Sequence, residues 1–149
     1  MDLALQAAQK AAHGGEVPVG AAVAAPDGRV LACCGNAPMH TNDPTAHAEI
    51  LALRQAGAAL GNYRLKGCVL VVTLEPRAMC AAAAVHARLA GVVYGAADAL
   101  AGAVTSRAEY LDGPAGSRVW HMGGVRSEAC AALLRDFFCL RRGHGEDSA

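Results

Sequence analysis

A helix is predicted to begin within the segment Asp43-Pro44-Thr45-Ala46-His47-Ala48-Glu49. Asp43 or Thr45 can cap this helix, because their side-chain oxygens accept the unpaired amide hydrogens of a first turn. Pro44 suits that turn, where no backbone donor is needed. The mostly apolar residues that follow continue the helical pattern to about residue 59, before Gly61.

The same segment carries two chemically reactive side chains, His47 and Glu49. A neutral imidazole can ligate a metal, and a carboxylate can move protons. At about 100° per residue, the two side chains would lie roughly 200° apart on a helix. We therefore expect His47 to ligate a metal and Glu49 to contact the metal's water, rather than both to ligate side by side. A buried His and a surface Glu on an ordinary helix is the alternative interpretation.

A second segment is expected to face the first. Residues 70–74 form an apolar, β-branched run that predicts a strand, and the Ala-rich residues 81–89 predict a helix. Cys80 falls in the first turn of this helix, where the positive end of the helix dipole is expected to lower the pKa of a thiol. Two helix starts would thus present His47 and Cys80 to each other.

The spacing of these residues matches the zinc-deaminase signature H-x-E…P-C-x-x-C, in which the Glu is an acid/base and not a ligand. The chain reads His47-Ala48-Glu49 and then Pro76-Arg77-Ala78-Met79-Cys80. Arg77 stands where the signature has its first Cys. An Arg side chain offers no lone pair to a metal and is not deprotonated in proteins. His47 and Cys80 alone form an incomplete ligand set.

Length, composition and charge limit the classes of protein to which the chain can belong. The 149 residues suit one domain, and a hydrophobic content of 54% argues against disorder. No apolar run reaches the length of a membrane span, and the N-terminus lacks the basic start of a signal peptide, so we expect a cytoplasmic protein with no membrane contact. The six cysteines are then expected to be free thiols or metal ligands. Because the formal net charge is zero, any RNA contact must come from a local patch.

Further blocks surround the two metal motifs in a fixed order between Leu3 and Arg142. They cover residues 16–21, 61–65, 73–76, 85–88, 92–96, 98, 137–138 and 141–142. Together with the metal motifs, these blocks resemble the bacterial tRNA adenosine deaminases of the cytidine-deaminase-like superfamily. The resemblance covers nearly the whole chain.

This resemblance implies an α/β fold of three layers, α/β/α, with a mixed sheet of about five strands and helices on both faces. The domain would span residues 1–142, followed by a mobile tail over residues 143–149. Besides the elements above, we expect a helix over 3–12, strands over 17–25, 30–35 and 92–96, a loop over 37–42, and a last helix over 127–140.

The resemblance also implies a reaction, the zinc-dependent hydrolytic deamination of adenosine to inosine at the wobble position of a tRNA. One Zn2+ per chain would be held by His47 and Cys80, and Glu49 would be the catalytic proton carrier.

The resemblance further implies substrate contacts and an assembly. Asn36 would line the base pocket, and Asp98 would lie near the target nucleotide. Arg141 and Arg142 would contact the tRNA anticodon loop, because the planar Arg fork suits phosphate. The implied assembly is a homodimer with its substrate site close to the two-fold interface.

Arg77 leads us to expect weak zinc binding and little deamination in the unaltered chain. Either Arg77 turns away and zinc binds weakly, or zinc is lost. Cys34 and Cys139 are poor substitutes for the missing third ligand, because neither is predicted at a helix start. Three functions stay open: an impaired tRNA adenosine deaminase, a deaminase of the same fold for another base or a free nucleobase, and a non-catalytic RNA-binding or dimerisation module.

Overall fold

The computed structural model of the chain describes residues 1–112 and 118–145. In chain order it contains α1 (Asp2–His13), β1 (Gly20–Ala24), β2 (Val30–Gly35), α2 (Pro38–Thr41), α3 (Ala48–Leu60), β3 (Val69–Leu74), α4 (Ala78–His86), β4 (Gly91–Ala96), β5 (Trp120–Met122) and α5 (Ser127–Gly145). Among the described residues, no helix combines the length and the apolar character that a membrane crossing requires.

The five strands form one mixed sheet in the order β2-β1-β3-β4-β5. β1 pairs antiparallel with both β2 and β3, whereas β3, β4 and β5 run parallel. A tight turn with Gly28 at φ +87° joins β1 to β2, and α4 provides the long crossover that parallel strands need. The predicted mixed α/β sheet is confirmed.

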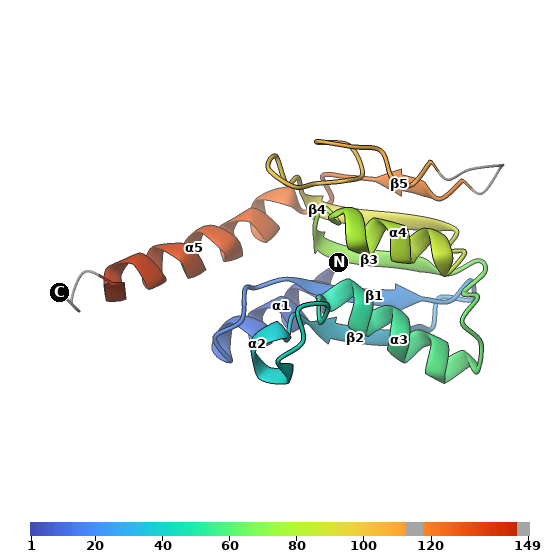
Figure 1. Cartoon of the computed structure of the whole chain (residues 1–149), viewed down its shortest axis with the longest axis horizontal. Helices are drawn as coiled ribbons and strands as arrows, with labels where there is room; N and C mark the ends of the chain where they lie inside the picture. Colours follow the sequence, from blue (N-terminus) through green and yellow to red (C-terminus); the bar gives the residue numbers. More distant parts are fainter. Residues whose placement is uncertain (113–117, 146–149) are drawn as a thin grey trace.

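Helices cover both faces of the sheet (Figure 1), as expected for the three-layer arrangement. α3 and α4 lie on one face, and α1 and the beginning of α5 lie on the other. Glycines allow close approach on the second face: a Cβ on Gly20 would collide with the backbone of Ala4 in α1, and one on Gly95 would collide with Cys130 in α5. These two positions require glycine because the helix lies directly on the strand.

The core between the sheet and α3 explains how α3 is positioned. Ala48, Ala52 and Ala56 recur every fourth residue, and each is 0% exposed. This stripe of small side chains packs with the fully buried Val23 and Leu70 of β1 and β3 in one cluster. Small residues bring the helix axis close to the sheet, so the start of α3 is held close to the sheet.

Several elements differ from the sequence predictions, among them α4, which spans Ala78–His86 instead of the predicted 81–89. The predicted loop over 37–42 contains the short helix α2. β1 starts later than the predicted run 17–25, because Pro18 lacks an amide donor and the Val19 amide bonds to the Val17 carbonyl instead of to a strand. α5 continues through residues 143–145, beyond the predicted domain end at 142, while residues 146–149 of the predicted tail lie outside the described part.

The irregular segment over residues 97–112, which follows β4, is organised around one buried carboxylate, Glu75, which follows β3 and is 1% exposed. Its Oε1 accepts the backbone amides of Val104, Thr105 and Ser106 at 3.2, 2.8 and 2.8 Å. Its Oε2 accepts the Asp98 amide at 3.0 Å and the Ser106 hydroxyl. Burial by itself opposes ionisation, but these hydrogen bonds outweigh it and lower the pKa of Glu75 to about 2.

We expect Glu75→Gln to destabilise the fold in a pH-dependent way. The lowering of the pKa from 4.5 to about 2 corresponds to about 3 kcal/mol of folding stability, present above pH 4.5 and lost as the pH falls towards 2. Urea unfolding of the variant should therefore show a deficit of this order at pH 7 that shrinks between pH 4.5 and 3. Glu109→Gln, on the exposed part of the same segment, is the matched control. A deficit that stays constant from pH 7 to 3 would contradict the assignment.

Candidate metal and catalytic site

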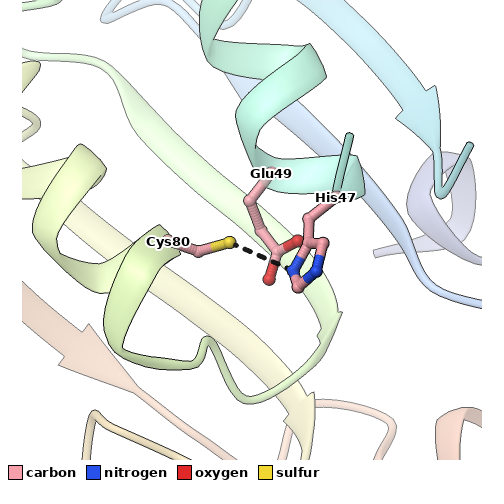
Figure 2. A group of neighbouring side chains, drawn as sticks. All are labelled: His47, Glu49 and Cys80. Carbon is pink, nitrogen blue, oxygen red and sulfur yellow. Dashed lines mark hydrogen bonds between the residues drawn. The ribbon is translucent and has the colours of Figure 1, made fainter. Parts of the chain in front are cut away.

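The starts of α3 and α4 meet at one point, as predicted. His47 is the residue that precedes α3, and Cys80 lies in the first turn of α4. The His47 Nδ1 atom is 3.6 Å from the Cys80 Sγ atom. Figure 2 shows that the Glu49 carboxylate lies beside the same two atoms, and the donor atoms of His47, Glu49 and Cys80 all lie within 4.8 Å of one another.

The predicted start of α3 is wrong by several residues. Asp43 does not cap the helix; its Oδ1 accepts the amide and hydroxyl of Thr45, closing a local turn. His47 has extended backbone angles, φ −70° and ψ 150°, and the helix begins at Ala48. The expected 200° separation of His47 and Glu49 therefore does not apply, because His47 precedes the helix. Their side chains approach each other instead.

Asn36, which follows β2, links the hairpin to this site. Its Oδ1 accepts the Ala48 amide at 2.9 Å and so satisfies one of the free donors at the start of α3. This bond leaves the side-chain NH2 of Asn36 available to an acceptor. Asn36 also lines a cavity of about 220 Å³ beside the cluster; the other lining residues are Val17, Val19, Pro38, His47, Glu49, Leu74, Glu75 and Arg77. The cavity is smaller than typical drug-sized pockets of roughly 300–1,000 Å³, and it suits a single base.

Burial controls the ionisation of the cluster. Glu49 is only 4% exposed, and burial raises the pKa of its carboxyl to about 7, against the opposing effect of its hydrogen bonds and of the Arg77 charge. Burial, followed by the neighbouring charge of Glu49, raises the pKa of the Cys80 thiol. The predicted lowering of that pKa by the helix dipole is therefore wrong, because desolvation outweighs it. Burial and then the Arg77 charge lower the pKa of His47, which favours the neutral imidazole that a metal needs.

Arg77 forms an ion pair with Asp98. The Arg77 Nε atom lies 3.2 Å from Asp98 Oδ2, and the other carboxylate oxygen of Asp98 accepts the amides of Leu100 and Ala101. The pair forms because β3 and β4 are parallel, with Leu74 opposite Ala96, so the residues after both strands meet at one edge of the sheet.

The predicted substrate residues are only partly brought together. Asn36 lines the cavity. Asp98 does not line it, but it pairs with Arg77, which does. Because the Asp98 carboxylate already binds Arg77 and two backbone amides, its contact with a substrate stays a prediction. Arg141 and Arg142 lie near the end of α5, which projects beyond the sheet (Figure 1). The Arg141 guanidinium lies 5.1 Å from the Phe137 ring centroid, and Arg142 donates to the Cys139 sulfur.

Sequence reasoning missed the positioning role of Glu75. The residue belongs to the matched block 73–76, and its place between a buried strand and Pro76 was the only signal available. Its burial and its hydrogen bonds depend on a segment some thirty residues later in the chain, as with the Ser106 amide, 31 positions away.

The donor atoms of the cluster have the chemistry and spacing of zinc ligands. Imidazole, thiolate and carboxylate are all zinc ligands, and ligands at 2.0–2.1 Å and 2.3 Å on a tetrahedral ion lie about 3.5 Å apart. The separation of 3.6 Å between His47 Nδ1 and Cys80 Sγ matches this value. Arg77 supplies no donor. The structure thus fits zinc through His47 and Cys80, and in the described part of the chain the only third donor of the cluster is Glu49.

Comparison with known proteins places these features in a family. The profile for the "Cytidine and deoxycytidylate deaminase zinc-binding region" matches residues 1–96. The tRNA(Ile)-lysidine synthase of Deinococcus radiodurans is 46% identical over 138 residues, which are 93% of this chain but 24% of the synthase. The chain thus spans about a quarter of the length of that relative.

Two further relatives match over most of their own length. The tRNA-specific adenosine deaminase of Haemophilus influenzae is 41% identical over 143 residues, covering 95% of this chain and 83% of the deaminase. A solved tRNA:A34 deaminase, studied for A-to-I editing at the wobble position, has a TM-score of 0.85 and 44% identity, covering 90% of this chain and 97% of that one. The chain therefore belongs to the cytidine and deoxycytidylate deaminase family of zinc-binding proteins, in the branch of the tRNA-specific adenosine deaminases.

Proposed function

We propose that this chain has the scaffold of a hydrolytic deaminase for the wobble adenosine of a tRNA, and that Arg77 strongly impairs its turnover. The observation that carries the proposal is the meeting of His47, Cys80 and the buried Glu49 beside a cavity of base size. The names of its deaminase relatives support adenosine in tRNA as the substrate.

The proposed reaction replaces the amino group at C6 of adenine with oxygen from water and releases ammonia. His47 and Cys80 would hold the zinc, which when bound supplies a water with a pKa near neutrality. Glu49 would accept a proton from the attacking water and return it to the leaving amine. The free NH2 of Asn36 would donate to the base and orient it.

We propose the tRNA anticodon loop as the partner, presented as a single strand whose bases can enter the cavity. Replacing both Arg141 and Arg142 with Ala should weaken binding to an anticodon stem-loop, because each lost phosphate contact lowers the salt slope of binding by about one. Filter binding at several salt concentrations measures the slope. Arg29→Ala, an exposed Arg at the turn between β1 and β2, is the matched control. An unchanged slope in the double variant would place the contact elsewhere.

We further propose a homodimer in the cytoplasm. A hollow of about 680 Å³ lies along the outer surface of α3 and α4 and includes Leu53 and the 70% exposed Tyr63. Two-fold pairs are the commonest oligomers, and an exposed apolar groove suits a second copy of the chain. All six cysteines are free, which agrees with a reducing compartment.

Light scattering should give the mass of a dimer. Tyr63→Asp should weaken the dimer by about tenfold or more, because it puts a charge into the apolar contact. Tyr110→Asp, which changes an exposed Tyr on another surface, is the control. A monomer at all working concentrations would remove this proposal.

Arg77→Cys is the central test of the function. It should complete the ligand set with His47 and Cys80, because the signature spacing around it is intact. Zinc per chain should rise towards one, and inosine should appear in an anticodon stem-loop, measured by metal analysis and nucleoside chromatography. Glu49→Ala on that background should abolish turnover and keep the metal, because Glu49 is then the proton carrier and not a ligand.

Other outcomes of this experiment point to the other two functions. Release of ammonia from free adenine, guanine or cytosine compounds, without inosine in the stem-loop, would favour a deaminase for another substrate. Stem-loop binding without any deamination, even with full zinc in Arg77→Cys, would favour a non-catalytic module. Full zinc occupancy and normal turnover in the unaltered chain would show that the ligand argument for Arg77 is wrong.

A further inference from the structure

We propose that in the unaltered chain Glu49 is itself a zinc ligand, which completes a His47, Cys80 and Glu49 site and removes the proton carrier from catalysis. This inference rests on the proposed function only for the identity of the metal. It assigns Glu49 a role that differs from that of the Glu in the deaminase signature, where the carboxylate is not a ligand.

Geometry is the first argument. The three donor atoms lie within 4.8 Å of one another, whereas donors on one tetrahedral zinc lie about 3.5 Å apart. The carboxylate therefore has to approach by about 1.3 Å at most, and rotation about the side-chain bonds of Glu49 moves it over such a distance. His47 precedes α3, and Figure 2 shows its imidazole beside the Glu49 carboxylate, with both groups facing Cys80.

Charge is the second argument. The signature supplies two thiolates, which balance the two positive charges of Zn2+. With Arg77 at the first Cys position, Cys80 alone leaves one positive charge unbalanced in a buried site, and an unpaired buried charge is costly. The carboxylate of Glu49, which is 4% exposed, is the second anion in the cluster and restores the balance.

Arg77 is the third argument, because its own charge is already compensated. Its guanidinium pairs with Asp98, and the Asp98 loop is in turn held by Glu75. Arg77 therefore already has an ion-pair partner in Asp98, and Glu49 is not needed as the partner of Arg77. The carboxylate remains available to the metal.

The test compares zinc affinity in four proteins: the unaltered chain, Glu49→Gln, Arg77→Cys and the double variant. Each is titrated with zinc alone against a chromophoric chelator, and no substrate is present. We expect Glu49→Gln to lower zinc affinity by about 100-fold or more in the unaltered chain. In the Arg77→Cys background the loss of zinc affinity on Glu49→Gln should be at least about tenfold smaller, because there Glu49 is outside the ligand set.

Controls separate ligand loss from misfolding. Cys80→Ser should lower zinc affinity in both backgrounds, and Glu109→Gln, which removes an exposed carboxylate, should lower it in neither. Circular dichroism of each apo protein checks the fold, and the double variant shows directly whether Gln at position 49 is tolerated.

Two results would overturn the inference. One is an equal loss of affinity on Glu49→Gln in both backgrounds; the other is the absence of zinc binding by the unaltered chain. The failure of the proposed function is a separate result, since a zinc-loaded Arg77→Cys variant that makes no inosine leaves the four affinities and their comparison intact.

Discussion

The site depends on the way the sheet fixes the starts of α3 and α4. The alanine stripe of α3 packs against β1 and β2, and α4 begins shortly after β3. Because β3 is the neighbour of β1, the two helix starts meet, with His47 Nδ1 and Cys80 Sγ 3.6 Å apart. Small residues and strand order, rather than any direct attraction between the two side chains, therefore create the donor pair.

A second constraint is the chain of contacts from Glu75 to Arg77. Glu75 holds the segment after β4 through its backbone amides, this segment presents Asp98, and Asp98 pairs with Arg77 at 3.2 Å. The ion pair accommodates the long Arg77 side chain at the edge of the candidate metal site and provides its charge with a partner. Arg77 is 55% exposed in its side chain, whereas Asp98 is 10% exposed, so the pair lies at the boundary with solvent. Arg77 therefore occupies this position as one half of a partly exposed ion pair.

The chemistry of the site follows from the loss of one anionic donor. A buried imidazole, thiol and carboxylate remain, and burial makes the neutral form of each favourable in the absence of a metal. A bound zinc would reverse that preference for the thiol and the carboxyl, since ligands must be deprotonated to bind. The same carboxylate cannot both complete the ligand set and carry protons, so on the proposal above Arg77 would couple metal binding to the loss of turnover.

The sequence by itself determined the mixed sheet, the residue types of the site and the order of the elements apart from α2 and β5. Apolar periodicity is a local property, so α1, β2, β3 and β4 were predicted close to their observed bounds. The signature spacing was likewise enough to select His47, Glu49, Cys80 and Arg77.

The tertiary structure alone decided how these groups act on one another. His47 lies before α3 because a local turn at Asp43 ends the preceding segment, and burial, which no local pattern reports, raises the pKa of Cys80. The pairing of Arg77 with Asp98 required the parallel register of β3 and β4, because only that register brings residues so distant in sequence to one edge of the sheet.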